Sequence, residues 1–341
     1  MRVLAVGGAG FVGSHVVRRL TDAGNMVTVL DNLSTGCPEA VEIAGRGRVD
    51  LIVGEAGDTG LVKETIRSRS IEVVMHFAAA SLVGESMRDP SKYWRNNVGS
   101  AVGLLDAMVD TGVDKIVFSS SAAVYGEPVR SPIAEDHPKA PTSTYGMTKL
   151  AIEHMLAGYD QAFGVRSISL RYFNAAGADE SGEMGEAHDP ETHLIPILLR
   201  TALGLQPSVR VFGSDYPTPD GTPVRDYIHV EDLADAHLLA MKALDLGAAT
   251  TAYNLGNGEG FSVLAVLREA ERVVGHGIPA LREGRRAGDP AVLVASSDRA
   301  RAELGWAPQH SDVRDIIASA WNWHSAHPQG FASRHGWGSL Q

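Results

Sequence analysis

The sequence has little cysteine and no long apolar run. Its single cysteine, Cys37, cannot form an intrachain disulfide. No stretch approaches the roughly 18 apolar residues that a membrane helix requires. The apolar start at 2–6 is interrupted by glycines and lacks the cleavage site of a signal peptide. We therefore expect a cytoplasmic protein without a membrane partner.

Basic residues are also scarce, since 30 lysines and arginines face 41 acidic residues, for a formal charge of −11. A nucleic-acid partner is therefore not expected, because phosphate backbones require a basic face. A small phosphate-bearing ligand remains compatible, because it needs only a few local arginines. Aromatic residues make up 6% and hydrophobic residues 44%, a balance that favours a well-packed α/β protein.

The first half alternates between short apolar runs and longer amphipathic segments. The pattern predicts strands at 2–6, 26–30, 49–53, 72–77, 115–119 and 166–171, and helices at 11–23, 59–69, 90–111 and 143–163. Near-continuous apolar strands alternating with helices indicate a parallel sheet covered on both faces. The predicted fold class is α/β, a Rossmann-type doubly wound parallel sheet with a smaller mixed α/β substrate domain.

This regularity breaks near residue 174. The segments 174–192 and 213–224 are predicted to be long loops, and helices are expected near 193–204, 230–245, 261–274 and 311–324. The sequence thus predicts a nucleotide-binding domain over 1–173, with a return segment near 225–256, and a substrate domain over 174–341.

A glycine-rich turn joins the first strand to the first helix. Gly7, Gly10 and Gly13 are spaced so that the backbone can approach a pyrophosphate at a helix N-terminus. Asp31 ends the next strand, where a carboxylate can bind the ribose hydroxyls and repel a 2′-phosphate. The combination favours NAD over NADP. The alternative is that the glycines only permit close packing and Asp31 only caps a turn.

Tyr145 and Lys149 lie four residues apart at the start of a predicted helix and share one face. Ser121 ends the preceding strand and can align the substrate oxygen. Lowering the pKa of a tyrosine by about 3 units requires about 4 kcal/mol. One cation at about 5 Å supplies about 3 kcal/mol, so Lys149 and an oxidised nicotinamide together suffice. The alternatives are a core tyrosine and a solvated lysine.

These residues belong to longer motifs that resemble the extended short-chain dehydrogenase/reductase family, most closely its UDP-glucose 4-epimerase branch. The general motifs are GGAGFVG at 7–13, DNLS at 31–34, HFA at 76–78, NN at 96–97, SSSAAVYG at 119–126, YGMTK at 145–149 and RYFN at 171–174. The motifs specific to this branch are YPTPDGTPVRDYIH at 216–229, RRAGD at 285–289 and HPQGF at 327–331.

The resemblance implies a reaction in which Tyr145 takes the proton of the sugar 4-hydroxyl, assisted by Ser121 and Lys149, while NAD takes the C4 hydride. The 4-keto sugar then rotates and the hydride returns to its other face, which exchanges the glucose and galactose configurations. The implied cofactor contacts are Gly7, Gly10, Phe11, Val12, Gly13, Asp31, Asn32, Ser34, Thr35, Gly36, Glu55, Phe77, Ala78, Ala79, Ser81, Asn96, Ser119, Tyr145, Lys149 and Phe173. The implied UDP-sugar contacts are Ser121, Asn174, His193, Leu194, Arg210, Val211, Phe212, Arg225, Arg286, Asp289 and Leu293.

Three positions depart from the family pattern. Glu55 replaces a common aspartate near the adenine, and Ser81 replaces a lysine near the pyrophosphate. Leu293 stands where some members have a tyrosine below the hexose, and the smaller side chain leaves room for an N-acetyl group. An epimerase of another UDP-sugar, such as UDP-N-acetylglucosamine, is therefore an alternative.

Three further alternatives fit the sequence less well. A sugar-nucleotide dehydratase needs an acidic pair where Ala122 and Ala123 stand, and a non-catalytic NAD sensor would not need Tyr145 and Lys149. A metal enzyme is suggested only by the grouping of four residues whose spacing fits no metal signature, so no metal is expected. These are His188, Asp189, Glu191 and His193. Family likeness implies a homodimer through helices 91–111 and 145–163, supported by the apolar surface of 98–109.

Overall fold

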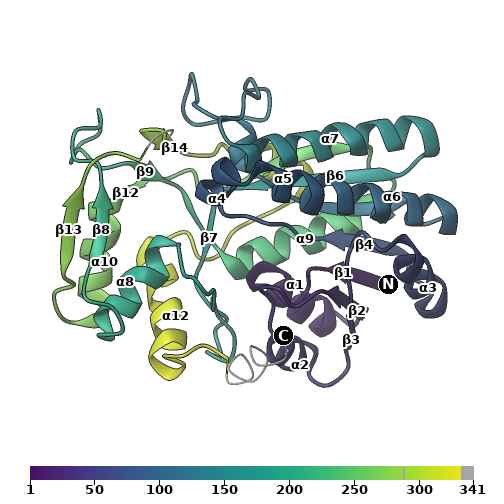
Figure 1. Cartoon of the computed structure of the whole chain (residues 1–341), viewed down its shortest axis with the longest axis horizontal. Helices are drawn as coiled ribbons and strands as arrows, with labels where there is room; N and C mark the ends of the chain where they lie inside the picture. Colours follow the sequence, from purple (N-terminus) through teal and green to yellow (C-terminus); the bar gives the residue numbers. More distant parts are fainter. Residues whose placement is uncertain (287–288, 332–341) are drawn as a thin grey trace.

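The computed structural model describes residues 1–286 and 289–331 (Figure 1). A large layered part, on the right in Figure 1, carries a sheet between helices, and a smaller mixed part lies beside it. Residues 287 and 288 of the RRAGD motif lie outside the described residues.

The central sheet contains seven parallel strands in the order β11-β6-β5-β4-β1-β2-β3. Their bounds are β1 (Arg2–Val6), β2 (Met26–Asp31), β3 (Asp50–Val53), β4 (Val73–His76), β5 (Lys115–Ser121), β6 (Arg166–Tyr172) and β11 (Thr251–Leu255). Consecutive residues of β1 are buried from Val3 to Val6, because helices cover both faces. The predicted Rossmann-type fold is confirmed, and the strand order reverses between β1 and β4, where such sheets bind ligands.

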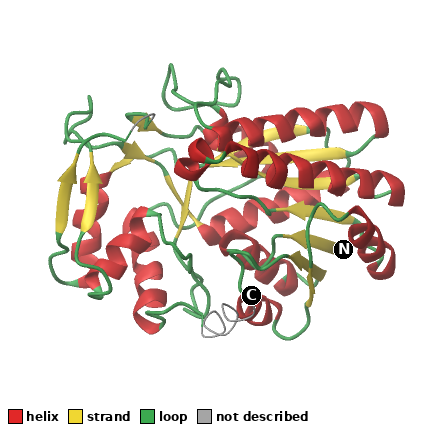
Figure 2. Cartoon of the chain, viewed as in Figure 1, coloured by secondary structure: helices red, strands yellow, loops and turns green. Residues whose placement is uncertain are grey.

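Two layers of helices enclose this sheet (Figure 2). One layer contains α1 (Phe11–Asp22), α2 (Pro38–Gly45), α9 (Val230–Asp245) and α11 (Asp298–Leu304). The other contains α3 (Thr59–Arg69), α4 (Val83–Arg88), α5 (Pro90–Tyr93), the π-helical turn η1 (Trp94–Gly99), α6 (Ser100–Thr111) and α7 (Thr144–Phe163). A short 3-10 turn, η2 (Ala122–Val124), follows β5.

The smaller part combines short strands with three helices around its own core. It contains α8 (Leu194–Ala202), α10 (Val263–Val274), α12 (Val313–Ala326), β7 (Asn174–Ala176), β8 (Val209–Phe212), β9 (Val224–Arg225), β10 (Tyr227–His229), β12 (Phe261–Ser262), β13 (Ala280–Glu283) and β14 (Val292–Leu293). The strands pair as β10-β7, β12-β9-β14 and β13-β8.

The structure differs from the sequence prediction in several elements. The single helix expected over 90–111 is divided by the wide turn η1, and the eight-residue α2 and the short strands of the smaller part were not predicted. The chain returns to the nucleotide-binding part through α9 and β11, as predicted, and then a second time as α11. Ala300 and Leu304 of α11 pack into the same core as α1 and α9.

Candidate active site

Two of the three glycines in the turn after β1 are needed by the protein's own packing. A Cβ at Gly7, where φ is 83°, would lie 2.4 Å from the Ala78 amide nitrogen. A Cβ at Gly13 would lie 2.3 Å from the Gly7 carbonyl oxygen. The packing interpretation therefore accounts for Gly7 and Gly13, which hold α1 close to β1 and β4.

Gly10 is different. The nearest atom to a Cβ built there is the Gly7 carbonyl oxygen at 3.6 Å, and its φ of −79° suits any residue. Gly10 occupies the N-cap of α1 without a side-chain cap, and Phe11 and Val12 form the first turn. Neither packing nor backbone strain requires glycine here, so the bare backbone fits a pyrophosphate seated on the N-terminus of α1.

Asp31 ends β2 and holds the turn. Its Oδ2 accepts the Ala9 amide at 3.0 Å and its Oδ1 accepts the Leu33 amide at 2.8 Å, and burial raises the pKa of this carboxyl. It therefore caps a turn, as the alternative interpretation stated, at the strand end where a ribose would bind. The turn brings Ser34, Thr35 and Gly36 beside the glycine loop, and a Cβ at Gly36 would lie 2.7 Å from that of Ala9.

The predicted adenine-side and nicotinamide-side residues occupy neighbouring strand ends. The Asn32 side-chain amide donates to both oxygens of Glu55 at 3.2 Å, which places this carboxylate beside the loop after β2. Phe77, Ala78, Ala79 and Ser81 follow β4. This segment is held by the buried Asn97, which accepts the Ala80 amide and donates to the Ala80 carbonyl and the Thr148 hydroxyl. Asn96 donates in turn to Asn97.

Tyr145 and Lys149 lie in the first turns of α7, which is capped by the Ser143 hydroxyl. The Lys149 ammonium donates to the Ser119 carbonyl at 2.7 Å and lies 5.8 Å from the centre of the Tyr145 ring. Ser121 lies close enough to the Tyr145 hydroxyl to lower the pKa of that phenol against the effect of burial. The structure thus assembles the three predicted catalytic residues at the carboxyl end of β5.

The protein's own groups do not favour a tyrosinate. Burial raises the pKa of Tyr145, the nearby Tyr172 adds to that rise, and Ser121 opposes it. Burial also lowers the pKa of Lys149 to about 7, against the attraction of the Glu153 carboxylate. Within this arrangement Lys149 is a weaker source of positive charge than the sequence argument assumed, so a second cation beside the phenol carries more of the shift.

A buried network behind Ser119 was missed by sequence reasoning. The Nδ1 of His237 donates to the Leu233 carbonyl, so its Nε2 accepts the Ser119 hydroxyl at 3.1 Å. Burial raises the pKa of Tyr172, and the nearby Ser119 opposes that rise. Burial also lowers the pKa of His237 to about 4, which keeps the ring neutral. His237 is 118 residues from Ser119 along the chain, and no local motif connects them.

A second missed network fixes α7 to the sheet. Glu153 accepts two hydrogen bonds from Arg171, at 2.9 and 2.6 Å, and one from the Ser120 hydroxyl at 2.6 Å. Arg171 also donates to the Tyr125 hydroxyl, which donates to Asn254 on β11. Both charged side chains of the ion pair are less than a tenth exposed, so the pair orients α7 and with it the catalytic residues.

Four predicted substrate residues meet at β9 and its neighbours. Arg225 forms an ion pair with Asp289 and lies opposite Leu293 in the β14-β9 pairing. Asn174 donates from its backbone and side chain to the Asp226 carbonyl, next to Arg225. Leu293 packs with Phe173 against the cluster around Tyr125. A guanidinium here can bind a diphosphate when the Asp289 carboxylate yields its place.

The remaining predicted substrate residues are distributed differently. Arg286 stacks on the Phe212 ring at 4.0 Å, a platform of the kind that binds a flat base. Val211 is buried, and the exposed Arg210 pairs with Glu283 at 3.6 Å. His193 and Leu194 begin α8 next to Glu186 and Glu191, and no described contact joins them to Arg225.

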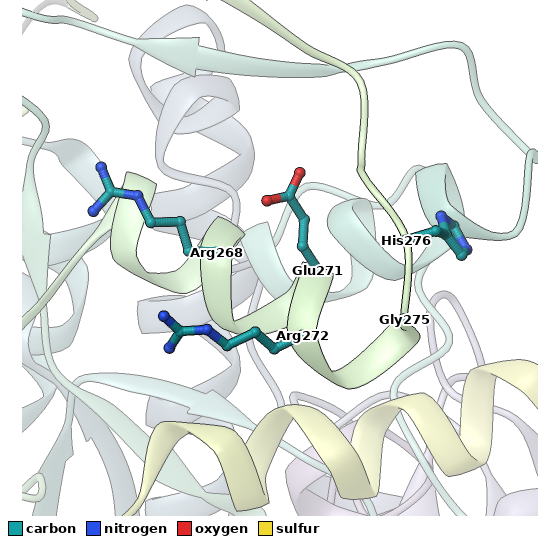
Figure 3. Close-up of a pocket in the computed structure, with 5 residues that line it drawn as sticks. All are labelled: Arg268, Glu271, Arg272, Gly275 and His276. Carbon is teal, nitrogen blue, oxygen red and sulfur yellow. The ribbon is translucent and has the colours of Figure 1, made fainter.

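Two further features lie outside this arrangement. Figure 3 shows an open surface pocket around α10 that contains none of the predicted site residues and is lined by Arg268, Glu271, Arg272, Gly275 and His276. Within residues 1–286 and 289–331, no helix combines the length and apolar character required to cross a membrane.

Comparisons with known proteins agree with this geometry. The model of the NAD dependent epimerase/dehydratase family matches residues 3–256. The UDP-glucose 4-epimerase of Lacticaseibacillus casei is 49% identical over 335 residues, covering 98% of this chain and 100% of that protein. A UDP-glucose 4-epimerase from Brucella ovis in complex with NAD superposes with a TM-score of 0.90 at 47% identity, covering 94% of this chain and 97% of that one.

A third relative has a nucleotide bound. The UDP-glucose 4-epimerase from Bifidobacterium longum in complex with NAD+ and UDP has a TM-score of 0.92 at 40% identity, over 97% of this chain and 100% of that one. The family resemblance predicted from the motifs is therefore confirmed. The chain belongs to the NAD dependent epimerase/dehydratase family.

Proposed function

We propose that this protein interconverts UDP-glucose and UDP-galactose with NAD as its cofactor. The observation that carries the proposal is the meeting of Tyr145, Lys149 and Ser121 at the carboxyl end of β5, in the same sheet edge as the glycine turn. The names of the full-length relatives agree with it. A non-catalytic NAD sensor is disfavoured, because binding alone would not require a buried Lys149 beside Tyr145.

The chain's own residues divide the work between proton transfer and binding. When bound, NAD+ would supply the acceptor for the C4 hydride and a positive charge, and its reduced form would supply the donor for the hydride's return. Tyr145 accepts the proton of the 4-hydroxyl and later returns it, while Ser121 holds the same oxygen. Lys149, fixed on the Ser119 carbonyl, stabilises the tyrosinate. Arg225 and the Phe212–Arg286 stack anchor the nucleotide, so that the 4-keto sugar can rotate and present its other face while the nucleotide stays bound.

The experiment measures conversion of UDP-galactose to UDP-glucose by wild type and Tyr145→Phe. We expect kcat to fall by about a hundredfold to ten-thousandfold, because the general base is lost. Tyr159→Phe is the matched control, since Tyr159 lies on the same helix and its hydroxyl binds Asp106 at the surface. Equal rates for Tyr145→Phe and Tyr159→Phe would contradict the proposal.

A second substrate follows from Leu293. Leu293 packs beside Phe173 and is smaller than the tyrosine that some family members carry at this position, which would leave more space at the hexose for an N-acetyl group. We therefore propose that UDP-N-acetylglucosamine is also accepted. Activity on that substrate no higher than in a reaction without enzyme would exclude it.

The assembly is proposed to be a homodimer in the cytoplasm. The helices α6 and α7 lie side by side (Figure 1) and expose the apolar side chains of Val102, Met147 and Phe163 to solvent. Exposed large apolar side chains on these two neighbouring helices are compatible with a subunit interface there, which the family likeness implies. The sole cysteine, Cys37, is buried, which fits a reducing compartment. Sedimentation of Phe163→Glu as a monomer beside a dimeric wild type would support the assembly, and a monomeric wild type would refute it.

A further inference from the structure

The loop between β7 and α8 gathers four side chains, three of which were already neighbours in the sequence grouping. In the structure, Glu186 lies with His188, Glu191 and His193, whereas Asp189, which the sequence had grouped with them, is not part of the cluster. One nitrogen or oxygen from each of the four lies within 4.8 Å of the others. Zinc accepts histidine nitrogens and carboxylate oxygens as ligands, usually four in a tetrahedral arrangement.

The distances suit a small cation. The Nδ1 atoms of His188 and His193 lie 2.9 and 2.7 Å from the same Glu186 oxygen, and His193 Nδ1 lies 3.3 Å from Glu191. Tetrahedral zinc with bonds of about 2.0–2.1 Å separates its ligand atoms by about 3.3 Å. The two histidine nitrogens now lie at hydrogen-bond distance from Glu186, so these side chains would have to separate by about half an ångström to hold the ion.

Burial and outer contacts also resemble a built site. The Glu186 and Glu191 side chains are 3% and 5% exposed, whereas His188 and His193 are 29% and 49% exposed. The Glu186 carbonyl accepts the Trp323 indole, and a Glu191 oxygen accepts the amides of Thr192 and His193. Such outer hydrogen bonds orient the groups that bind a metal.

The two carboxylates of the cluster favour a bound cation. Two nearly buried carboxylates, those of Glu186 and Glu191, lie together and both face the Nδ1 atom of His193. The buried His324 lies close enough for both carboxylates to act on its pKa, and its Nε2 has no hydrogen-bond partner among the described residues. A divalent cation with neutral imidazoles would balance the two carboxylates.

A second group of similar composition lacks this geometry. In the cluster of His229, Glu231 and His310, the His229 Nε2 bonds to the Ser319 hydroxyl and its Nδ1 accepts the Glu231 amide. Both of its nitrogens are therefore engaged. The nearest carboxylates lie 3.8 and 3.9 Å from His310.

We propose that one divalent metal ion of the type of Zn²⁺ binds at a structural site formed by Glu186, His188, Glu191 and His193. The ion would tie the loop after β7 to the start of α8, where His193 is the N-cap. It would also fix His188, whose ring meets the Phe11 ring edge-on at 6.5 Å beside the glycine turn. The site thus braces the smaller part against α1, and it does not depend on the proposed reaction.

The test measures zinc binding directly. The NAD-loaded protein is stripped with a chelator, dialysed and titrated with Zn²⁺ against a chromophoric competitor, and Co²⁺ is added separately for its visible absorption. We expect one Zn²⁺ per chain and a Co²⁺ spectrum of tetrahedral intensity. Losing an outer-shell partner alone costs about 10–100-fold in affinity, so Glu186→Gln and His193→Gln should each cost more than about 100-fold.

Two control variants locate the site. His276→Gln alters an exposed histidine of the surface pocket in Figure 3, and His310→Gln alters the second cluster; both should bind zinc as wild type does. Circular dichroism and retained NAD check that each variant is folded. Absence of stoichiometric zinc binding by the wild type overturns the proposal whatever the variants do. Binding that is abolished by His310→Gln, or unchanged in both ligand variants, also overturns it.

Discussion

Replacing Gly10 and Gly13 by alanine separates ligand binding from packing at the glycine turn. At Gly13 the new methyl group would lie 2.3 Å from the Gly7 oxygen and 2.8 Å from the Gly8 Cα. These are backbone atoms that cannot move aside without displacing the turn. Overpacking of this kind destabilises the fold by about 1–3 kcal/mol, and this clash is at the severe end of that range. The higher helix propensity of alanine stabilises α1 by about 1 kcal/mol in the opposite direction. We expect Gly13→Ala to lower the free energy of unfolding by at least about 1 kcal/mol.

At Gly10 the methyl group meets nothing nearer than 3.6 Å, and the backbone conformation is open to alanine. Because glycine is preferred to alanine at an N-cap, we expect the free energy of unfolding to fall by no more than about 1 kcal/mol. NAD binding should weaken, because the methyl group displaces the pyrophosphate from the amides of α1. Losing one hydrogen bond to a charged group costs about 1.5–3 kcal/mol, which raises Kd about ten- to hundredfold.

The assay combines urea unfolding of the NAD-free protein with NAD titration by calorimetry. Gly158→Ala on the exposed side of α7 is the control, since its Cβ would meet no atom within 4 Å. It should leave NAD affinity unchanged and should not destabilise the fold. The reasoning is refuted if Gly10→Ala binds NAD as tightly as wild type, or if Gly13→Ala is as stable as wild type.

Three further changes test other parts of the structure. The pKa of Lys149 is about 7 in the folded protein and 10.5 in the unfolded chain, so the unfolded chain binds more protons between these pH values. The free energy of unfolding of the NAD-free protein should therefore rise with pH in this range, by up to about 1.4 kcal/mol per pH unit relative to Lys149→Met. Parallel pH profiles for the two proteins would contradict this. Glu153→Gln leaves Arg171 buried without its ion partner and should cost about 3–5 kcal/mol in urea unfolding, whereas a loss below about 1 kcal/mol would show that the pair does not stabilise the fold. Leu293→Tyr should abolish activity on UDP-N-acetylglucosamine while retaining that on UDP-galactose, and an equal fall in both rates would exclude a selective role.

The features predicted from sequence are those encoded within about thirty residues. The strand, glycine turn, helix and Asp31 form one continuous unit, and Tyr145 and Lys149 share a helix face, so periodicity and spacing were sufficient. Two-residue strands such as Val224–Arg225 carry no periodicity of their own and form only because β12 and β14, distant in sequence, pair on either side of them. They could not be predicted locally.

Contacts between distant segments were missed for a related reason. His237 lies in the middle of α9 with no neighbouring motif, yet it fixes the Ser119 hydroxyl across the sheet. The sequence likewise grouped Asp189 with the loop histidines, whereas the fold turns Glu186 toward them. Which carboxylate of a polar loop points inward depends on the backbone path, and composition does not determine that path.

The electrostatics of the catalytic pair connect cofactor binding to base strength. Burial by the protein raises the pKa of Tyr145 and lowers that of Lys149 to about 7, so both groups tend toward their neutral forms. A positive charge at the nicotinamide position acts on the phenol through the same low-dielectric surroundings, where a cation at about 5 Å is worth about 3 kcal/mol. The burial that opposes ionisation of the Tyr145 phenol therefore also makes that ionisation depend strongly on the positive charge of the oxidised cofactor. We infer that the tyrosinate forms when the hydride acceptor is present, and reduction to NADH should raise the pKa of Tyr145 measured by ultraviolet titration. An equal pKa in the NAD+ and NADH forms would refute this coupling.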